Sequence, residues 1–166
     1  YGEIYKRSFE DKVSEITDNA GKGGREYAEL YQKSIEAKLT EVSEKVQAGA
    51  AEYAQIMMTT GAKPSRSDLS VDVDDYTFSL IEGTVNAMLT GGEAEAPSQQ
   101  ELIDHYLDQV KKPERSELSI DVDDFTFSII ERSVDAAIRG GEYSGPTEEE
   151  FRDAYLDTVE KPRREE

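Results

Sequence analysis

Apolar residues recur at helical spacing over the first 60 residues of the chain. In residues 1–19 these positions are three or four residues apart among charged neighbours, as in an amphipathic helix: Ile4 or Tyr5, Phe9, Val13 and Ile16. Residues 19–24 then include three glycines, which make a continued helix costly. We therefore expect a short first helix that ends at this glycine-rich run.

The longest periodic stretch covers residues 25–60. Its apolar positions have a mean spacing of 3.75 residues, which is close to an α-helix and longer than the 3.5 of a left-handed coiled coil: Tyr27, Tyr31, Ile35, Leu39, Val42, Val46, Ala50, Tyr53 and Met57. Such a helix extends for about 50 Å, and Gly61 and Pro64 are expected to end it. Its apolar stripe is covered by the rest of the chain, by a second copy, or by an apolar surface.

A direct repeat with a constant offset of 49 residues follows, without a gap. Its strictest part is LSVDVDDYTFSLIE at residues 69–82 against LSIDVDDFTFSIIE at residues 118–131. A fixed period of this size is typical of tandem supersecondary units. The predicted organisation is therefore a helical association region at 1–62, acidic repeats at 63–112 and 113–162, and a charged tail at 163–166.

Each repeat opens with alternating apolar and polar residues, which predict either a short strand or an extended lead-in. A helix follows, and aspartates at its start cap backbone N–H groups: Asp72, Asp74 and Asp75, with Asp121, Asp123 and Asp124 in the second repeat. Glycine pairs at 91–92 and 140–141 end these helices. Ser98 with Glu101, and Thr147 with Glu150, match a capping box that starts a second helix.

The predicted fold is thus mainly α: a long N-terminal amphipathic helix, preceded by a shorter helix, and two tandem 49-residue helical-hairpin repeats with short extended lead-ins. We expect the two repeats to pack together around a shared core of apolar side chains: Leu69, Val71, Val73, Phe78, Ile81 and Val85, with Leu118, Ile120, Val122, Phe127, Ile130 and Val134.

The formal net charge of −18 lies mostly in the repeats, because residues 1–62 carry −3 and residues 63–166 carry −15. This field disfavours nucleic acid as a partner. No apolar run approaches the about 20 residues of a transmembrane helix, so we expect a protein of the cytoplasm or of a larger assembly. The chain starts at Tyr1, which leaves a removed leader as an alternative.

The sequence offers little for catalysis, and we expect no enzyme and no cofactor. Cysteine is absent, and the single histidine, His105, has Ala154 as its counterpart in the second repeat. Ser79 and Ser128 have no base nearby in sequence. The six aspartates named above are weak candidates for calcium, because an EF-hand register would place Thr77 where a glycine is required.

Two sets of residues are candidates for binding a protein partner. The first is the long stripe, namely Tyr27, Tyr31, Ile35, Leu39, Val42, Val46, Tyr53 and Met57. The second consists of arginines and aromatics that the second repeat gains over the first, residue types that often anchor interfaces: Arg132, Arg139, Tyr143, Phe151 and Arg152. Solvent-exposed sequence drift is the alternative explanation for the second set.

The segments GREYAELYQKSIEAKL at 24–39 and QAGAAEYA at 47–54 are rich in alanine, glutamate, lysine and glutamine. Over about residues 9–60 the chain resembles the amphipathic helices of phasins and related polyhydroxyalkanoate granule proteins. The resemblance implies a non-enzymatic coat helix on a polyester granule, and it does not extend to the acidic repeats.

Three functional hypotheses follow from these features. The first is a non-enzymatic scaffold or adaptor that associates through the long helix and docks proteins on its acidic repeats, since repetition suits multivalent binding. The second is a surface-active coat of a granule or envelope. The third is a small accessory subunit of an enzyme or of a viral or organellar assembly.

Overall fold

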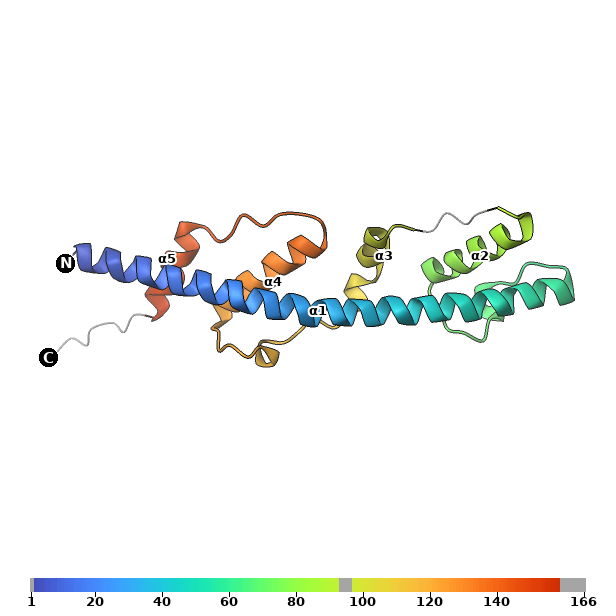
Figure 1. Cartoon of the computed structure of the whole chain (residues 1–166), viewed down its shortest axis with the longest axis horizontal. Coiled ribbons are helices and arrows are strands. Elements are labelled where there is room, and N and C mark those ends of the chain that lie inside the picture. The colour runs from blue at the N-terminus through green and yellow to red at the C-terminus, as the bar shows by residue number, and fades with distance from the viewer. Residues whose placement is uncertain (1, 93–96, 159–166) are drawn as a thin grey trace. The chain divides into compact units, whose positions relative to one another are not determined.

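A computed structural model of the chain describes residues 2–92 and 97–158 (Figure 1). Over these residues the regular structure is helical and includes no β-strand. The α-helices are α1 (Gly2–Thr60), α2 (Asp75–Thr90), α3 (Gln99–Tyr106), α4 (Asp124–Ile138) and α5 (Glu148–Thr158), with 3-10 turns at Arg66–Asp68, Leu107–Gln109 and Arg115–Glu117. The prediction of a mainly α fold with a long N-terminal helix is confirmed.

The predicted break at residues 19–24 is wrong, because α1 continues through it for 59 residues in all. Tertiary packing overrides the low helix propensity of glycine here. Gly23 is buried, and Ile16 and Tyr27 on either side of the run are buried as well. The short first helix and the long helix are therefore one element.

The chain forms two compact units, and each combines part of α1 with one repeat. One unit consists of Tyr1–Gln32 and Lys111–Glu166, and the other of Lys33–Val110. This division differs from the predicted one, in which residues 1–62 stood apart from the repeats. The predicted charged tail at 163–166 lies outside the described residues.

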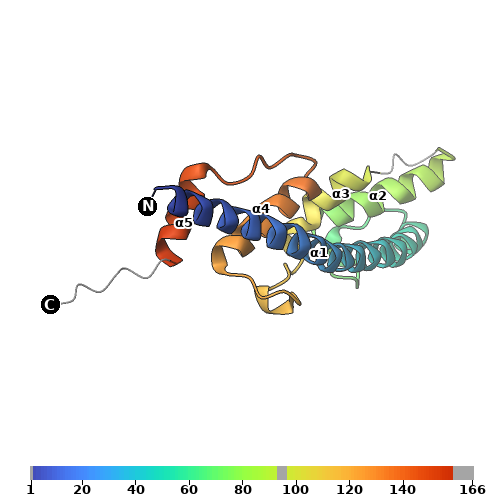
Figure 2. The ribbon, with the colours of Figure 1, turned by 60° about the vertical axis from the view of Figure 1, so that its left-hand side comes forward.

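In the unit Lys33–Val110, α2 lies alongside α1 (Figures 1 and 2). The core cluster joins the two helices through the lead-in before α2, and its buried members are Ala50, Tyr53, Leu69, Val73, Ile81 and Val85. Val71 and Phe78 pack against this cluster and are partly buried. The lead-in is therefore an apolar plug that inserts beside α1.

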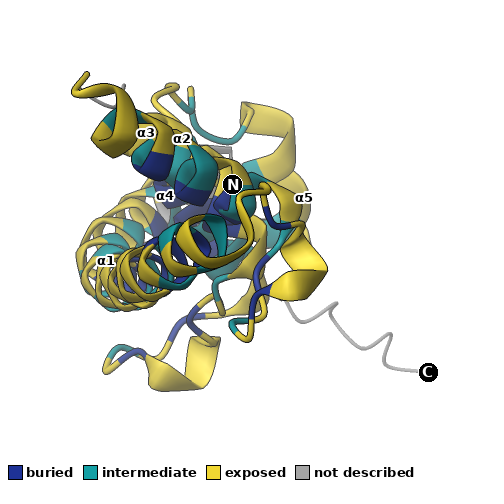
Figure 3. Cartoon of the chain, turned by 90° about the vertical axis from the view of Figure 1, so that its right-hand side faces the viewer, coloured by how far each residue is buried: buried dark blue, intermediate teal, exposed yellow. Residues whose placement is uncertain are grey.

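In the other unit, α4 takes the corresponding place beside the first half of α1. Its buried apolar residues include Ile16, Tyr27, Tyr31, Leu118, Val122, Ile130 and Val134. Figure 3 shows buried positions on the side of the helices that faces their neighbours and exposed positions along the outer side of α1. Ile120 and Phe127 are half-buried.

Eight of the twelve predicted core side chains are buried and the other four are partly buried. The expectation that the two repeats share one core was wrong. Instead, residues 69–85 cluster with Ala50 and Tyr53 of α1, and Ile130 contacts α1 at Gly23. Each repeat thus buries its apolar face on α1, which covers the stripe that the sequence left without a partner.

The lead-ins are extended but form no strand, so the strand alternative is also wrong. The predicted caps are present where the helices begin. The side chain of Asp74 accepts a hydrogen bond from the Thr77 N–H at 2.7 Å, and Asp123 accepts one from Thr126 at 2.8 Å. Ser98 and Thr147 accept N–H bonds from Glu101 and Glu150 at 3.1 and 3.2 Å.

None of the helices in the described part of the chain combines the length and the hydropathy that crossing a membrane requires.

The contact between Gly49 and Ile81 predicts how substitutions at Gly49 change the stability of the protein. Gly49→Leu should lower the free energy of unfolding by about 1–3 kcal/mol, because the new side chain would overlap a buried isoleucine. Gly21→Leu is the matched control, since Gly21 is exposed on the same helix with open space around it. It should raise stability by about 0.5–1 kcal/mol through helix propensity alone. Urea denaturation followed by circular dichroism measures both, and shifts of the same sign would contradict the packing at Gly49.

Candidate docking sites

The helix α1 carries a repeat of its own, with a period of 26 residues. Residues 1–26 and 27–52 align without a gap, and nine positions are identical: Tyr1, Glu3, Tyr5, Ser8, Glu10, Lys12, Glu15, Gly23 and Glu26 recur as Tyr27, Glu29, Tyr31, Ser34, Glu36, Lys38, Glu41, Gly49 and Glu52. Two motifs of the form Gly-x-x-Glu-Tyr-Ala therefore lie on α1, at residues 23–28 and 49–54. Each of them contacts one 49-residue repeat.

The glycine of each motif lets a helix of the repeat approach the backbone of α1. A Cβ atom on Gly23 would lie 2.6 Å from Cδ1 of Ile130, and one on Gly49 would likewise overlap Cδ1 of Ile81. Ile81 and Ile130 occupy equivalent positions in the 49-residue repeat. A side chain at either glycine would therefore displace the isoleucine that packs there.

The glutamate of each motif binds a serine in the lead-in of a repeat. Glu52 accepts the Ser70 N–H at 2.9 Å through Oε1 and the Ser70 hydroxyl at 2.8 Å through Oε2. Glu26 accepts the same pair of hydrogen bonds from Ser119, also at 2.9 and 2.8 Å. Bonds to an ionised carboxylate are stronger than neutral ones, and two of them fix the direction of the lead-in.

The tyrosine of each motif lies fully buried beside a phenylalanine of the repeat. Tyr53 packs on Phe78 with ring centroids 6.1 Å apart, and Tyr27 packs edge-on to Phe127 at 5.9 Å. Neither tyrosine hydroxyl has a hydrogen-bond partner among the described residues. Burial, followed by the charges of Glu131 and Asp135, raises the pKa of Tyr27. Burial, followed by the charge of Glu82, raises that of Tyr53.

The first set of predicted partner residues is thus largely covered by the chain itself. Tyr27, Tyr31, Ile35, Val42 and Tyr53 are buried. The remaining members, Leu39, Val46 and Met57, are half-buried. Leu39 and Val46 line an open groove of about 520 Å³ beside α2, which is the part of the stripe that a partner can still reach.

The second set of predicted partner residues gathers around α4 and α5, where four of the five contact one another or their helix neighbours. Arg132 lies 3.7 Å from Glu150, and a hydrogen bond to Tyr143 raises its pKa. Phe151 packs edge-on to Phe125 at 5.6 Å, and Arg152 pairs with Glu148 at 3.3 Å. Arg139 caps the end of α4. These residues therefore have structural roles within the repeat.

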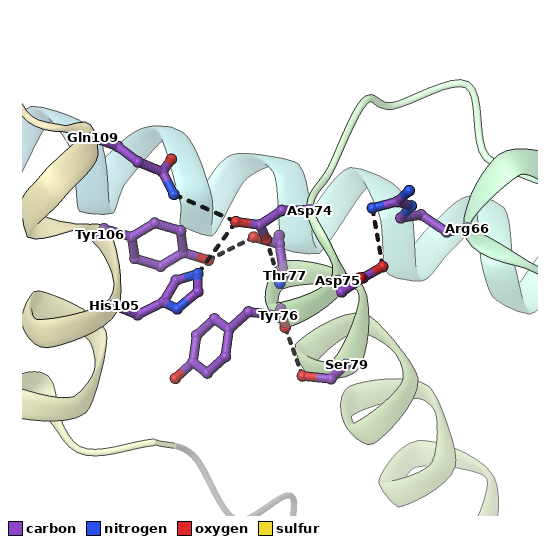
Figure 4. Close-up of polar contacts among 9 residues, drawn as sticks. All are labelled: Arg66, Asp74, Asp75, Tyr76, Thr77, Ser79, His105, Tyr106 and Gln109. Carbon is purple, nitrogen blue, oxygen red and sulfur yellow. Dashed lines mark hydrogen bonds and ion pairs between the residues drawn. The ribbon is translucent and has the colours of Figure 1, made fainter.

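His105, the single histidine considered for catalysis, belongs to a polar cluster at the start of α2 (Figure 4). His105 Nε2 lies 3.2 Å from Oδ2 of Asp74, and its ring stacks on Tyr76 with centroids 4.0 Å apart. Burial would raise the pKa of Asp74, but hydrogen bonds from Thr77, His105 and Gln109 hold it well below the ordinary value. The cluster therefore caps α2 and joins it to α3.

The serines and several of the aspartates considered for chemistry bond to neighbours within their own repeats. Ser79 donates its hydroxyl to the Tyr76 carbonyl at 2.6 Å, and Ser128 does the same to Phe125 at 2.7 Å. Asp75 pairs with Arg66 at 3.0 Å, and Asp124 pairs with Arg115. Within residues 2–92 and 97–158, no group of three or more histidine, aspartate or glutamate side chains is placed to hold a metal ion.

Comparisons with protein-family models, with curated proteins and with solved structures found no match.

The serine–glutamate pair makes a prediction that hydrogen exchange can test. Glu52→Ala removes both acceptors of Ser70, so the Ser70 amide should exchange roughly tenfold faster, as a local loss of about 1.4 kcal/mol implies. Glu44→Ala is the control, because Glu44 is exposed on the same helix. It should leave that exchange rate unchanged. An unaltered Ser70 rate in Glu52→Ala would show that this pair does not hold the lead-in.

Proposed function

We propose that the chain is a non-enzymatic scaffold in which one long helix carries two acidic docking modules. Each module is a 49-residue repeat seated on a Gly-x-x-Glu-Tyr-Ala motif of α1. The observation that carries the proposal is that the same three contacts occur twice: glycine with isoleucine, glutamate with serine, and tyrosine with phenylalanine. Duplicated modules on one support suit multivalent binding better than a single reaction.

The charge of the modules supports a basic protein surface as the partner. Residues 63–166 carry 26 acidic and 11 basic side chains. Asp72 and Asp121 occupy equivalent positions in the two lead-ins, and both are exposed. Complementary charge would steer a basic partner toward the modules and make its capture sensitive to salt.

The burial of the apolar stripe of α1 argues against the coat hypothesis. A phasin-like coat would lay the apolar face of α1 on a granule, but Tyr27, Tyr31 and Tyr53 are fully buried, and Tyr27 and Tyr53 pack on phenylalanines of the repeats. Exposing them would require undocking both modules. The full-length chain should therefore stay in solution when it is mixed with polyester or lipid particles, and partition onto them would favour the coat over the scaffold.

Charge reversal tests the proposed docking on the modules. The protein carrying Asp72→Lys and Asp121→Lys should capture at least tenfold less partner protein from an extract of its own cells. Each of these exposed carboxylates contributes to the attraction of a basic partner. Glu29→Lys with Glu44→Lys is the matched control, with the same change in net charge on exposed positions of α1. That variant should capture the same proteins as the unaltered chain.

Two results would contradict the scaffold. One is equal capture by the two charge-reversed proteins, which would show that the modules do not recognise the partner. The other is the absence of any captured protein, together with monomeric behaviour in light scattering.

A further inference from the structure

A hollow of about 540 Å³ lies between α4 and α5 in the second repeat. Its lining includes the aromatic Phe125 and the small residue Ala154. The other lining residues are Asp123, Asp124, Ser128, Arg132, Glu150 and Asp153. Four carboxylates, one guanidinium and an aromatic residue thus line the same hollow, which is a favourable environment for a cation that is also planar.

The first repeat shows what the equivalent place holds. Position 154 corresponds to His105, and positions 123 and 125 correspond to Asp74 and Tyr76. In the first repeat the imidazole of His105 stacks on Tyr76 at 4.0 Å and lies 3.2 Å from Asp74 (Figure 4). The second repeat keeps the aromatic ring and the carboxylate but has alanine in place of the imidazole.

The charges around the hollow favour a cation even after the internal pairs are considered. Arg132 lies 3.7 Å from Glu150, and Asp124 is paired with Arg115. Burial would raise the pKa of Asp123, but hydrogen bonds from Thr126, with the charges of Lys12 and Arg115, hold it below the ordinary value. Asp123 is therefore ionised near neutral pH, as Asp74 is, and Asp153 adds a further exposed carboxylate.

We propose that this hollow binds a planar cationic side chain of a partner protein, an imidazolium or a guanidinium, in the position that His105 occupies in the first repeat. The incoming group would stack on Phe125 and face Asp123. The proposal deepens the scaffold function, and rests on it for the partner, by naming the chemistry that the second module recognises. Replacing Ala154 with a larger residue should abolish binding, because the new side chain would fill the hollow.

Small cations test the hollow itself in the full-length protein. Imidazolium chloride and guanidinium chloride, each added at pH 6 below denaturing concentrations, should give saturable NMR shifts at Phe125, Ser128 and Ala154. A dissociation constant of about 1–10 mM is expected for fragments of this size. Methylammonium chloride controls for charge and ionic strength, since it lacks a plane to stack, and it should give shifts at least fivefold weaker. The tighter of the two planar ions identifies the side chain as histidine or arginine.

Exchanging the two repeat positions provides matched variants. Ala154→His should remove the saturable shifts, because the protein's own imidazole then takes the site. His105→Ala should create a second site with shifts at Tyr76 and Ser79, because it gives the first repeat the same combination of aromatic ring, carboxylate and alanine. Circular dichroism confirms that each variant is folded before titration.

Three outcomes would overturn the proposal: no saturable shifts with either planar ion, equal shifts with methylammonium, or shifts that persist in folded Ala154→His. Each of these concerns the hollow alone. Failure of the scaffold function would appear instead as a loss of protein capture with the small-cation binding intact.

Discussion

Two isoleucines, Ile81 and Ile130, contact α1 at places where the helix presents only backbone. Burying an isoleucine side chain stabilises a protein by about 1.5–3 kcal/mol, whereas glycine inside a helix costs about 0.5–1 kcal/mol relative to alanine. The gain exceeds the cost, so Gly23 and Gly49 are tolerated in α1 for as long as the repeats are docked. In each unit the continuity of the helix and the docking of the repeat therefore depend on the same contact.

The contacts to α1 are common to both repeats, whereas other positions on α2 and α3 differ from their counterparts on α4 and α5. Leu69, Ser70 and Ile81 have the counterparts Leu118, Ser119 and Ile130, and all six contact or pack toward α1 in corresponding ways. By contrast, Gly83 corresponds to Arg132 and His105 to Ala154. Docking constrains the face of each repeat that contacts α1, and the other positions remain available for separate binding properties. This distribution supports a scaffold whose two modules recognise different features.

The elements that depend on local pattern were predictable from the sequence. Apolar spacing indicates every α-helix, and the caps at Asp74, Asp123, Ser98 and Thr147 follow from residue types at helix starts. The break expected at residues 19–24 was wrong because glycine propensity is a local quantity, while Ile130 is supplied from more than 100 residues away in sequence. The lead-in alternation did not distinguish a strand from a plug, since both bury every second residue.

The candidate docking sites were harder to predict from the sequence, because each combines the 26-residue repeat of α1 with the 49-residue repeat. The 26-residue repeat of α1 is present in the sequence, but only the structure shows that one of its motifs receives one 49-residue repeat. The arginine and aromatic substitutions indicated the α4–α5 face. Their contacts, such as Arg132 with Glu150 and Phe151 with Phe125, depend on how α5 packs against α4, which residue types alone do not indicate.

Amide hydrogen exchange at Gly23 in the full-length protein tests the central claim most directly, because the claim makes helix continuity depend on the docked isoleucine. The Gly23 amide should exchange as slowly as that of Tyr27 in the unaltered chain, and Ile130→Ala should accelerate both amides while leaving Gly49 protected. Two results would contradict the account: rapid exchange at Gly23 in the unaltered chain, or a slow exchange rate at Gly23 that Ile130→Ala leaves unchanged.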